Sequence, residues 1–279
     1  MICKILIMSG AGNIFSAYDN RKSNLKNNFF IENASRFCYL EDIKTEGLFV
    51  INMSEQGCDF AAEFFNPDGS YGAMCGNGGR CAVQFASQIG MLKNNPKKIN
   101  FTMAGKNYSA EKYADLISLF FPKPLVNCIE KTVDVDDKVI KGYYSDVGAD
   151  HFVFPASVIN LNQDNFYDEN IHEFCRKIRF HELFSPRGVN VNVFLISGNE
   201  VLLRTYERGV EAQTGACGTG AVSTALTVTN KFGLNYPVKI IPPSRRELVV
   251  NYLGDDPLNP DEMILTGDAI IVKETEVII

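Results

Sequence analysis

Short apolar runs separated by turns make up most of the hydrophobic pattern of this chain. Runs such as residues 49–52 (Phe-Val-Ile-Asn) and 201–204 (Val-Leu-Leu-Arg) fit the pleated surface of a β-sheet. Strands are predicted at residues 2–8, 47–53, 59–65, 99–103 and 107–121 in the first half of the chain, and at 132–147, 151–156, 189–197, 200–206, 236–242, 246–252 and 262–274 in the second.

Helices are predicted at residues 33–43, 76–92, 168–178 and 218–231. The second and fourth carry apolar or small residues at i, i+3 and i+4, and they are apolar nearly all round. A helix with no polar face is expected in the interior of a protein. Sheets curled around one central buried helix, twice over, would meet that requirement, so the sequence predicts an α+β fold.

Prolines interrupt the β pattern near residues 122–124 (Pro-Lys-Pro), which predicts a domain boundary there. The domains expected are residues 1–121 and 122–265. At 279 residues the chain has the length of one large or two medium domains.

The two helices predicted to be buried each begin with the same motif. Residues 75–78 read Cys-Gly-Asn-Gly and residues 217–220 read Cys-Gly-Thr-Gly, each preceded by polar or turn-forming residues. We interpret both as a cysteine at or just before a helix N-terminus, followed by glycines that allow close approach to the backbone. The repeated motif indicates a duplicated unit whose halves build one composite site.

A helix N-terminus gives these cysteines a specific chemistry. The first N–H groups of a helix have no intrahelical partner and carry partial positive charge. A cysteine there is expected to have a lowered pKa, so that a thiolate forms near neutral pH. The glycine N–H groups can hold a small anion such as a carboxylate. Two such sites facing each other would suit removal of a proton from one face of a carbon and its return to the other.

Charge and cysteine content narrow the function. A net charge of −6 without a basic block argues against nucleic acid and anionic membranes as partners, and no apolar run has the length of a membrane span. No secretion signal is recognisable at the N-terminus, which indicates a cytoplasmic location. The cysteines, expected to be mostly free thiols, are Cys3, Cys38, Cys58, Cys75, Cys81, Cys128, Cys175 and Cys217.

Other roles for these motifs are weaker. With three histidines and no Cys-x-x-Cys pair, metal binding is not expected. A glycine-rich loop could instead hold a nucleotide phosphate, but residues 75–80 lack the spacing and the Lys-Ser/Thr of a phosphate loop. A single buried cysteine is usually inert, and glycines usually mark a turn. The two motifs together favour a catalytic function.

Motifs across nearly the whole chain resemble those of the diaminopimelate epimerase family, and in the same order. They are residues 9–13 (Ser-Gly-Ala-Gly-Asn), 64–70 (Phe-Phe-Asn-Pro-Asp-Gly-Ser), 74–81, 188–192 (Gly-Val-Asn-Val-Asn), 207–210 (Glu-Arg-Gly-Val) and 216–221. Proline-type racemases share the paired cysteines, but they typically carry a histidine where this chain has Asn77. The family resemblance therefore favours the epimerase.

The resemblance implies epimerisation of LL- to meso-diaminopimelate, a precursor of lysine and peptidoglycan, without pyridoxal phosphate, metal or other cofactor. It implies two similar domains, each a curled, mostly antiparallel sheet around a central helix, with the site in the cleft between them. The final strand, residues 266–279, would return to the first domain. A homodimer in the cytoplasm that acts on a small-molecule amino-acid substrate would fit the family.

By the same resemblance, the site residues fall into groups. Cys75 and Cys217 would be base and acid and exchange roles with the direction of reaction. The remaining assignments are main-chain N–H groups of Gly76, Asn77, Gly218 and Thr219 on the reacting α-carboxylate, Asn13 at the reacting centre, Asn66, Asn190 and Arg208 on the distal end of the substrate, and Glu207 and His151 beside the cysteines.

Some of these residues also have a purely structural interpretation. Asn66 begins an Asn-Pro-Asp-Gly turn that needs no ligand. His151 could be an ordinary residue at the start of a strand. Glu207 and Arg208 could be a solvated pair that ends a strand.

The chain departs from the family pattern at two places on the distal side. The family usually has Asn-Pro before the histidine, whereas this chain has Ala149 and Asp150 before His151. Ala149 cannot grip a substrate as an amide does, and Asp150 is expected to repel a carboxylate. The loop from Glu207 to Cys217 is also one residue longer than usual. We therefore expect a looser distal pocket that could admit other amino acids, glutamate among them.

The rival hypotheses within enzymes are a broad-specificity glutamate- or proline-type racemase and an isomerase on the same fold that has lost the role of one cysteine. The presence of both Cys75 and Cys217 argues against such an isomerase. From another class, an amino-acid-binding protein without turnover would also use helix starts, but it would not need two opposed thiols.

Overall fold

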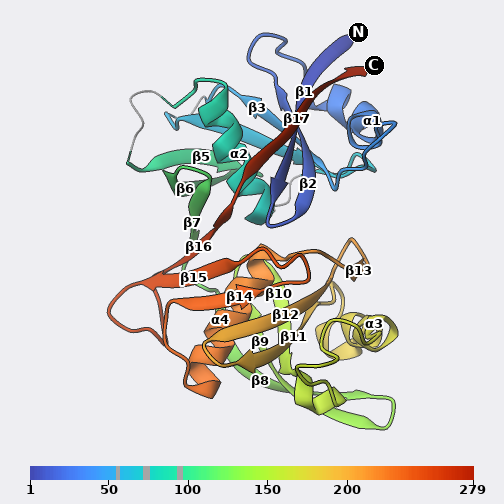
Figure 1. Cartoon of the computed structure of the whole chain (residues 1–279), viewed down its shortest axis with the longest axis vertical. Helices are drawn as coiled ribbons and strands as arrows, with labels where there is room; N and C mark the ends of the chain where they lie inside the picture. Colours follow the sequence, from blue (N-terminus) through green and yellow to red (C-terminus); the bar gives the residue numbers. More distant parts are fainter. Residues whose placement is uncertain (55–56, 72–75, 93–96) are drawn as a thin grey trace. The chain divides into compact units, whose positions relative to one another are not determined.

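The computed structural model describes residues 1–54, 57–71, 76–92 and 97–279. The chain divides into two compact units, Met1–Phe120 with Thr266–Ile279, and Phe121–Leu265 (Figure 1). Both units are α+β and consist mainly of strands, as the sequence predicted. In the described part of the chain, no helix has both the length and the apolar character needed to cross a membrane.

The first unit combines strands from both ends of the chain. Its elements are β1 (Ile2–Gly10), β2 (Asn13–Asp19), α1 (Asn27–Cys38), β3 (Leu48–Asn52), β4 (Phe60–Phe65), α2 (Gly76–Gln88), β5 (Ile99–Met103), β6 (Lys106–Tyr113), β7 (Leu116–Pro122) and β17 (Ile270–Ile278). The last strand, β17, runs antiparallel beside β1, with Ile2 opposite Ile278, and it brings the two termini together (Figure 1).

The second unit lies within one continuous segment. Its elements are β8 (Val126–Val135), β9 (Lys138–Asp146), β10 (Asp150–Pro155), η1 (Ala156–Ile159), α3 (His172–Arg179), η2 (Glu182–Phe184), β11 (Asn190–Ser197), β12 (Glu200–Glu207), β13 (Ala212–Gln213), α4 (Gly218–Phe232), β14 (Val238–Ile241), β15 (Leu248–Leu253) and β16 (Glu262–Asp268), the last of which ends in the first unit.

The two units repeat one topology. In the first, β2 pairs parallel with β3, β3 antiparallel with β4, and β4 parallel with β5, with α2 in the crossover. In the second, β10 pairs parallel with β11, β11 antiparallel with β12, and β12 parallel with β14, with α4 in the crossover. The duplication inferred from the two cysteine motifs therefore extends to the order and direction of the strands.

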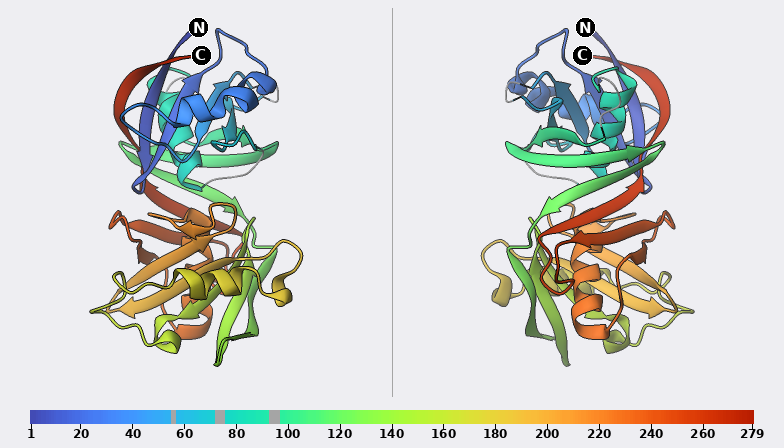
Figure 2. Two further views of the ribbon diagram at one scale, coloured as in Figure 1. Left: turned by 90° about the vertical axis from the view of Figure 1, so that its right-hand side faces the viewer. Right: turned by 90° about the vertical axis from the view of Figure 1, so that its left-hand side faces the viewer.

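Each unit has a buried helix that packs against most of its strands. Helix α4 contacts strands β8 to β12, β14 and β15, and Figure 2 shows it in orange along the strands of its own unit. Its apolar and small residues from Ala221 to Val228 are all buried. Gly233 ends the helix in the left-handed conformation, with its N–H on the Val228 carbonyl, a common glycine C-cap. Helix α2 contacts β1, β2, β3, β4 and β6 in the same way.

Three of the predicted strands are each two strands. Residues 107–121, 132–147 and 262–274 were predicted as continuous, but turns or breaks divide them into β6 and β7, β8 and β9, and β16 and β17. Ala114 and Asp136 adopt left-handed φ values of 55° and 53° at two of these turns. Glycine usually marks such positions, and because neither residue is glycine, the sequence carried no clear signal for a turn.

The first unit also departs from prediction near its start. Strand β2 was not predicted, because its small and polar residues hide the alternating pattern of a strand. Helix α1 runs from Asn27 to Cys38 instead of over residues 33–43, and it buries Phe30 and Phe37 in the core beneath it. The remaining helices lie within a few residues of their predicted positions.

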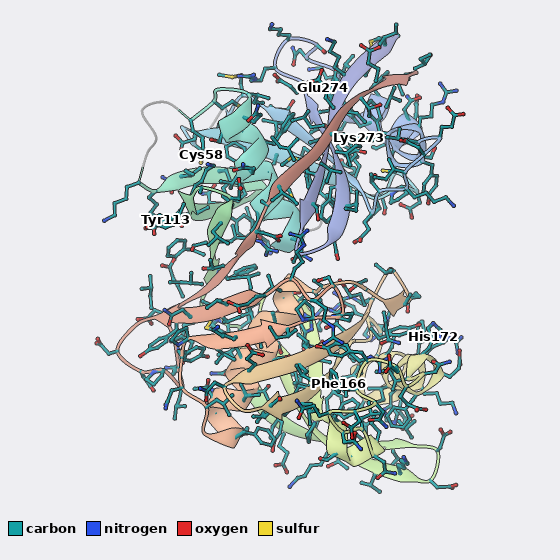
Figure 3. All side chains as sticks on the ribbon, in the orientation of Figure 1. Cys58, Tyr113, Phe166, His172, Lys273 and Glu274 are labelled. Atoms are coloured by element: carbon teal, nitrogen blue, oxygen red, sulfur yellow. The ribbon has the colours of Figure 1, made fainter. Side chains whose placement is uncertain are left out.

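A buried arginine ties the core of the second unit to a neighbouring loop. Arg204 on β12 is 4% exposed, and it donates to the Phe166 carbonyl at 2.6 Å and the Glu169 carbonyl at 2.8 Å. The Phe166 ring is fully buried in the same core (Figure 3). These bonds hold the loop that leads into α3 against the sheet.

Candidate active site

Cys217 is the N-cap of helix α4, as its position before two glycines predicted. Its backbone is extended at φ −119° and ψ 114°, and its Sγ accepts a bond from the Gly220 N–H at 3.4 Å. The Thr219 Oγ1 lies 3.6 Å from the same sulfur. The thiol is therefore held at the start of the helix, where main-chain donors gather.

The expected lowering of the Cys217 pKa is wrong for this structure. Burial raises the pKa of the thiol well above its ordinary value, and the charge of Glu207 raises it further. The bond from the Gly220 N–H acts in the opposite direction but is outweighed. Desolvation and a neighbouring carboxylate thus dominate over the helix N-terminus, and Cys217 is a protonated thiol at neutral pH.

Glu207 ends strand β12 and places its carboxyl group beside Cys217. Thr214 donates a short hydrogen bond to its Oε1, and the Cys217 thiol donates to it as well. Burial raises the pKa of Glu207 despite these two bonds. The carboxyl group can therefore hold a proton more readily than an exposed glutamate, and it shares hydrogen bonding with the thiol.

His151 on β10 reaches Cys217 through Thr219. Its Nδ1 lies 3.2 Å from the Asn192 Oδ1, and its Nε2 lies 3.0 Å from the Thr219 Oγ1. Burial lowers the pKa of His151 to about 4, so the ring is neutral. The histidine is therefore not an isolated residue at a strand start, because it connects two elements of the site.

The amide of Asn192 determines which nitrogen of His151 carries the proton. The Asn192 Nδ2 donates to the Gly220 carbonyl at 2.9 Å and to Thr224 Oγ1 at 3.1 Å, so its Oδ1 faces the ring. The Nδ1 of His151 must then be the donor, which leaves Nε2 to accept from the Thr219 hydroxyl. With its hydrogen directed to the ring, Thr219 presents an acceptor to Cys217.

Asn190 and Arg208, both assigned to the distal end of the substrate, lie together. The Asn190 Oδ1 accepts from the Arg208 main-chain N–H at 2.9 Å, and its Nδ2 donates to the Asp150 carbonyl at 2.8 Å. The Arg208 Nη1 donates to Asp150 Oδ2 at 2.8 Å and to the Gly188 carbonyl at 3.3 Å. Arg208 is thus a partly buried residue bonded to Asp150, Asn190 and Gly188, and not a solvated residue ending a strand.

Asp150 stands where it was expected to repel a carboxylate, but it has three partners of its own. Tyr144 donates to its Oδ1 at 2.5 Å, and Arg187 and Arg208 both form ion pairs with it. Burial acts to raise the pKa of Asp150, but the bonds from Tyr144 and Arg208 and the two arginine charges outweigh it and hold the pKa below its ordinary value. The carboxylate is ionised and paired.

In the first unit, helix α2 begins at Gly76, directly after Cys75 in the chain. Cys75 itself lies outside the described residues. Gly76 and Asn77 are buried, and the Asn77 Oδ1 accepts from Arg80 Nη2 at 2.8 Å. Gly10 at the end of β1 allows this helix to approach closely, since a Cβ there would lie 2.8 Å from the Asn77 carbonyl oxygen.

The other two predicted residues of the first unit differ in their surroundings. Asn13 begins β2 and is 3% exposed. Asn66 lies in its turn with the Nδ2 on Ser70 Oγ at 2.9 Å, and Gly69 N–H bonds to its carbonyl at 2.9 Å. The side chain of Asn66 therefore has a structural partner within the turn.

Residues that sequence reasoning did not assign complete the site of the second unit. Asn192 is fully buried, and Thr214 belongs to the loop between Glu207 and Cys217. Asn192 could have been found, because it lies two residues after Asn190 on the same strand and so faces the same side. Thr214 carried no such signal. In the part of the chain that the structure describes, no cluster of three or more His, Cys, Asp or Glu side chains could hold a metal ion.

Comparison with known proteins identifies related sequences and folds. Residues 5–115 match the family model of diaminopimelate epimerase. The chain is 35% identical to the diaminopimelate epimerase of Aquifex aeolicus, with 96% of this chain and 95% of that protein aligned.

Solved structures with similar folds include a Bacillus anthracis phenazine biosynthesis protein of the PhzF family (TM-score 0.76, 12% identity, all of both chains). A hydroxyproline epimerase from Agrobacterium vitis has a TM-score of 0.72 at 13% identity, covering 99% of this chain and 92% of that one. At such low identity these two show the shared fold alone.

Proposed function

The chain belongs to the diaminopimelate epimerase family, and we propose that it interconverts LL- and meso-diaminopimelate by proton transfer between the thiols of Cys75 and Cys217. It is an isomerase of amino acids. The reaction breaks the bond between the α-carbon and its hydrogen on one face and forms a new one on the other face. One thiolate accepts the proton, and the other thiol supplies one.

The observation that supports this proposal most directly is the state of Cys217. A thiol whose pKa is raised by burial and by Glu207 is protonated at neutral pH, as an acid in this step has to be. In the reverse direction Cys217 must act as the base. Glu207, whose own pKa is raised, is placed to take the thiol proton and so to make the thiolate.

The proposed holder of the reacting α-carboxylate is the first turn of each buried helix. The main-chain N–H groups of Gly218 and Thr219 belong to the first turn of α4, and those of Gly76 and Asn77 to the first turn of α2. These groups carry partial positive charge and point out of the helix. They would stabilise the charge that develops on the carboxylate as the α-proton leaves.

His151 and Asn13 would act on the reacting centre without being the proton carriers. The chain from Asn192 through His151 to Thr219 holds the Thr219 hydroxyl as an acceptor toward Cys217. The Thr219 oxygen and the Glu207 carboxylate are then both acceptors beside the sulfur, which favours the protonated thiol. Asn13 would contact the substrate at the α-carbon, and its burial limits the water that can reach it.

The distal end of the substrate is assigned to Asn66, Asn190 and Arg208, with Arg208 pairing with the distal carboxylate. The described contacts of the Arg208 side chain use its Nη1, so the guanidinium is anchored at one end while other N–H groups can bind a ligand. With Ala149 in place of an amide, the pocket is expected to bind the distal end less tightly. This expectation is tested by comparing kcat/KM for glutamate and for diaminopimelate. A ratio below about a thousandfold would agree with a loose pocket, whereas a larger ratio, above about 4 kcal/mol of discrimination, would contradict it.

Solvent deuterium incorporation at the α-carbon tests the proposal. Wild type should incorporate deuterium into LL-diaminopimelate and invert the centre, and Cys75→Ala and Cys217→Ala should each lose epimerisation. Cys58→Ala, which removes a half-buried thiol outside the proposed site, is the matched control and should keep full activity. Exchange with another amino acid but not with diaminopimelate would favour a glutamate- or proline-type racemase. If no amino acid exchanged, the proposal that the protein is an enzyme of this kind would be refuted.

We further propose that the enzyme acts in the cytoplasm as a homodimer. The described cysteines are free thiols, which suits a reducing compartment. Light scattering on the purified protein would distinguish dimer from monomer. Fractionation of cells that produce the protein would test its location.

A further inference from the structure

The carboxylate of Asp150 lies between two arginines of very different exposure. Its side chain is 7% exposed, whereas that of Arg208 is 28% exposed and that of Arg187 is 70% exposed. Arg208 Nη1 lies 2.8 Å from Oδ2, and Arg187 Nη2 lies 3.3 Å from both carboxylate oxygens. The Tyr144 hydroxyl donates to Oδ1 at 2.5 Å.

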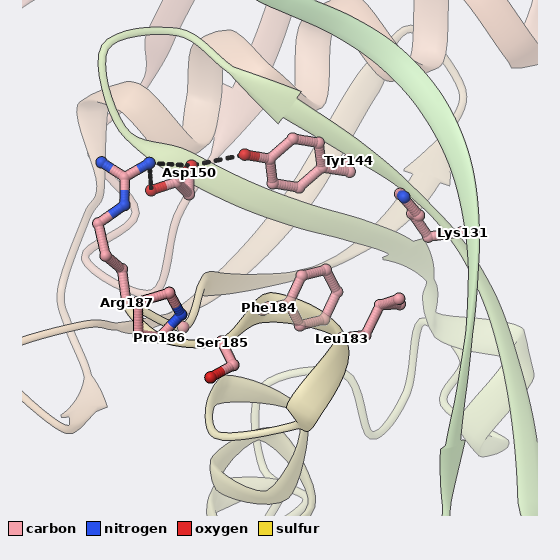
Figure 4. A pocket seen from close by; sticks show the side chains of 9 residues that line it. Lys131, Tyr144, Asp150, Leu183, Phe184, Ser185, Pro186 and Arg187 are labelled. Carbon is pink, nitrogen blue, oxygen red and sulfur yellow. Dashed lines mark hydrogen bonds and ion pairs between the residues drawn. The ribbon is translucent and has the colours of Figure 1, made fainter.

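The outer side of this carboxylate faces a pocket that Arg208 does not line. The pocket has a volume of about 270 Å³ and is lined by Tyr144, Asp150, Arg187 and Lys131 together with residues 183–186 and Gly188. Figure 4 shows Tyr144 and Arg187 both directed at Asp150, with Lys131 farther along the wall. Asp150 therefore separates Arg187, on the pocket side, from Arg208.

The charges of this cluster do not cancel. Because Asp150 is held ionised, it can neutralise one arginine, and the cluster of Arg187, Asp150 and Arg208 keeps one positive charge. Without Arg187, the pair of Asp150 and Arg208 would be neutral. A substrate carboxylate that approaches Arg208 would then meet a guanidinium whose charge is already compensated.

Asp150 also fixes the guanidinium of Arg208 in place. Together with the Gly188 carbonyl it holds Nη1, while Asn190 holds the main-chain N–H of the same residue. A guanidinium anchored at one end loses less side-chain entropy when a ligand binds. The carboxylate that departs from the family pattern thus has a positioning effect as well as a charge.

We propose that Asp150 and Arg187 form a paired device that sets selectivity for the distal carboxylate of the substrate. Asp150 positions Arg208, and Arg187 offsets the negative charge of Asp150, so that Arg208 still attracts a carboxylate. Both are positioning residues that act through Arg208. The inference rests on the proposed function, since it takes Arg208 as the group that binds the distal end.

A double-mutant cycle tests this device. We expect Arg187→Gln to lower kcat/KM for LL-diaminopimelate by about fivefold, mainly through KM, a modest effect because solvent screens an exposed arginine. Asp150→Asn should have a smaller effect, because it removes the repulsive charge together with the anchor. The double variant should have a kcat/KM less than about twofold below that of Asp150→Asn alone, because Arg187 no longer has a charge to offset.

Two controls separate the device from damage to the fold and from total charge. Lys131→Gln removes one positive charge from the same pocket without a contact to Asp150, and it should leave kcat/KM unchanged. The loss caused by Arg187→Gln should shrink in about 0.5 M salt, where the Debye length falls to a few ångströms. A structural role of Arg187 would be insensitive to salt and would not be suppressed by Asp150→Asn.

The outcomes distinguish this inference from the proposed function. Suppose that wild type epimerises diaminopimelate. If Arg187→Gln then leaves kcat/KM unchanged, or lowers it equally in wild type and in Asp150→Asn, the paired device is refuted and the proposed function is retained. If wild type does not turn over diaminopimelate, the proposed function fails. The double-mutant cycle can then be measured as binding, by calorimetric titration of LL-diaminopimelate into the same variants to obtain Kd. Equal Kd for wild type and Arg187→Gln would then overturn the device as well.

Discussion

Replacing Asn192 by leucine should destabilise the second unit and release the tautomer of His151. The amide makes three buried hydrogen bonds, to the Gly220 carbonyl at 2.9 Å, to Thr224 at 3.1 Å and to His151 at 3.2 Å. Thr224 can turn its hydroxyl to another acceptor. The Gly220 carbonyl would still accept the N–H of Thr224 within helix α4, whereas the His151 Nδ1–H would keep its position and lose its partner.

The magnitude follows from the orphaned N–H of His151 and from the larger side chain of leucine. A buried polar group left without a partner costs about 1–3 kcal/mol, and leucine branches at the same atom as asparagine but is bulkier, so overpacking adds about 1–3 kcal/mol. We expect a loss of about 4 kcal/mol in the free energy of unfolding, a large part of the 5–15 kcal/mol typical of a domain. Urea denaturation followed by circular dichroism would measure it, with unchanged m values as the check on two-state unfolding.

Asn230→Leu is the matched control. Asn230 lies on α4, the helix that Asn192 contacts, is part-buried, and bonds to the Leu226 carbonyl of its own helix at 3.0 Å. Its loss should change stability by less than about 1 kcal/mol, because a part-buried group can bond to water. A long-range ¹H–¹⁵N NMR spectrum of wild type should show His151 protonated on Nδ1. Protonation on Nε2, or a loss below about 1 kcal/mol for Asn192→Leu, would refute the reasoning.

Three further outcomes follow from the same site. Glu207→Gln should lower the pKa of the Cys217 thiol, because it removes a neighbouring negative charge, and absorbance at 240 nm against pH would show thiolate forming at lower pH than in wild type. Burial lowers the pKa of His151 from 6.5 to about 4, so between these pH values only the unfolded state takes up the proton. The free energy of unfolding should therefore fall as the pH drops from 6.5 toward 4, by up to about 3 kcal/mol. Urea midpoints at a series of pH values should therefore fall less steeply for His151→Gln; an equal slope contradicts the assignment. Gly220→Ala should lower kcat at least tenfold, or about 1.4 kcal/mol. Its Cβ would lie 2.9 Å from Thr205 Oγ1 and 3.1 Å from the Cys217 Cβ, so Cys217 would have to shift. Activity close to wild type would contradict this and mean that the N-cap tolerates the added atom.

Much of the fold could be predicted from local patterns. The helices after Cys75 and Cys217 begin at Gly76 and Gly218 as expected, because glycines after a polar segment and apolar residues at helical spacing are both local signals. The burial of α4 followed from the lack of a polar face. The pairing of the strands did not, since parallel partners such as β10 and β11 are brought together by the crossover between them.

The site could be predicted as a set of residues but not as a network. Cys217, Glu207, His151, Asn190 and Arg208 were all named from the family resemblance, and the structure places them in two neighbouring groups of bonds within one unit. The resemblance gave no information on their hydrogen-bond partners. Asn192 was part of a quoted motif and was still not recognised as the residue that orients the histidine.

What the sequence determined by itself was the repeated cysteine motif with its helix and the α+β class, because these depend on residues close together in the chain. The residues of the candidate site were predicted from the family resemblance. Tertiary structure alone decided the protonation of Cys217 and the pairing of Asp150. The Asp150 carboxylate meets Arg187 and Arg208 from 37 and 58 residues away, and His151 meets Thr219 from 68 residues away. Desolvation and charge act through space, so the thiol expected as a thiolate is protonated, and the carboxylate expected to repel is paired.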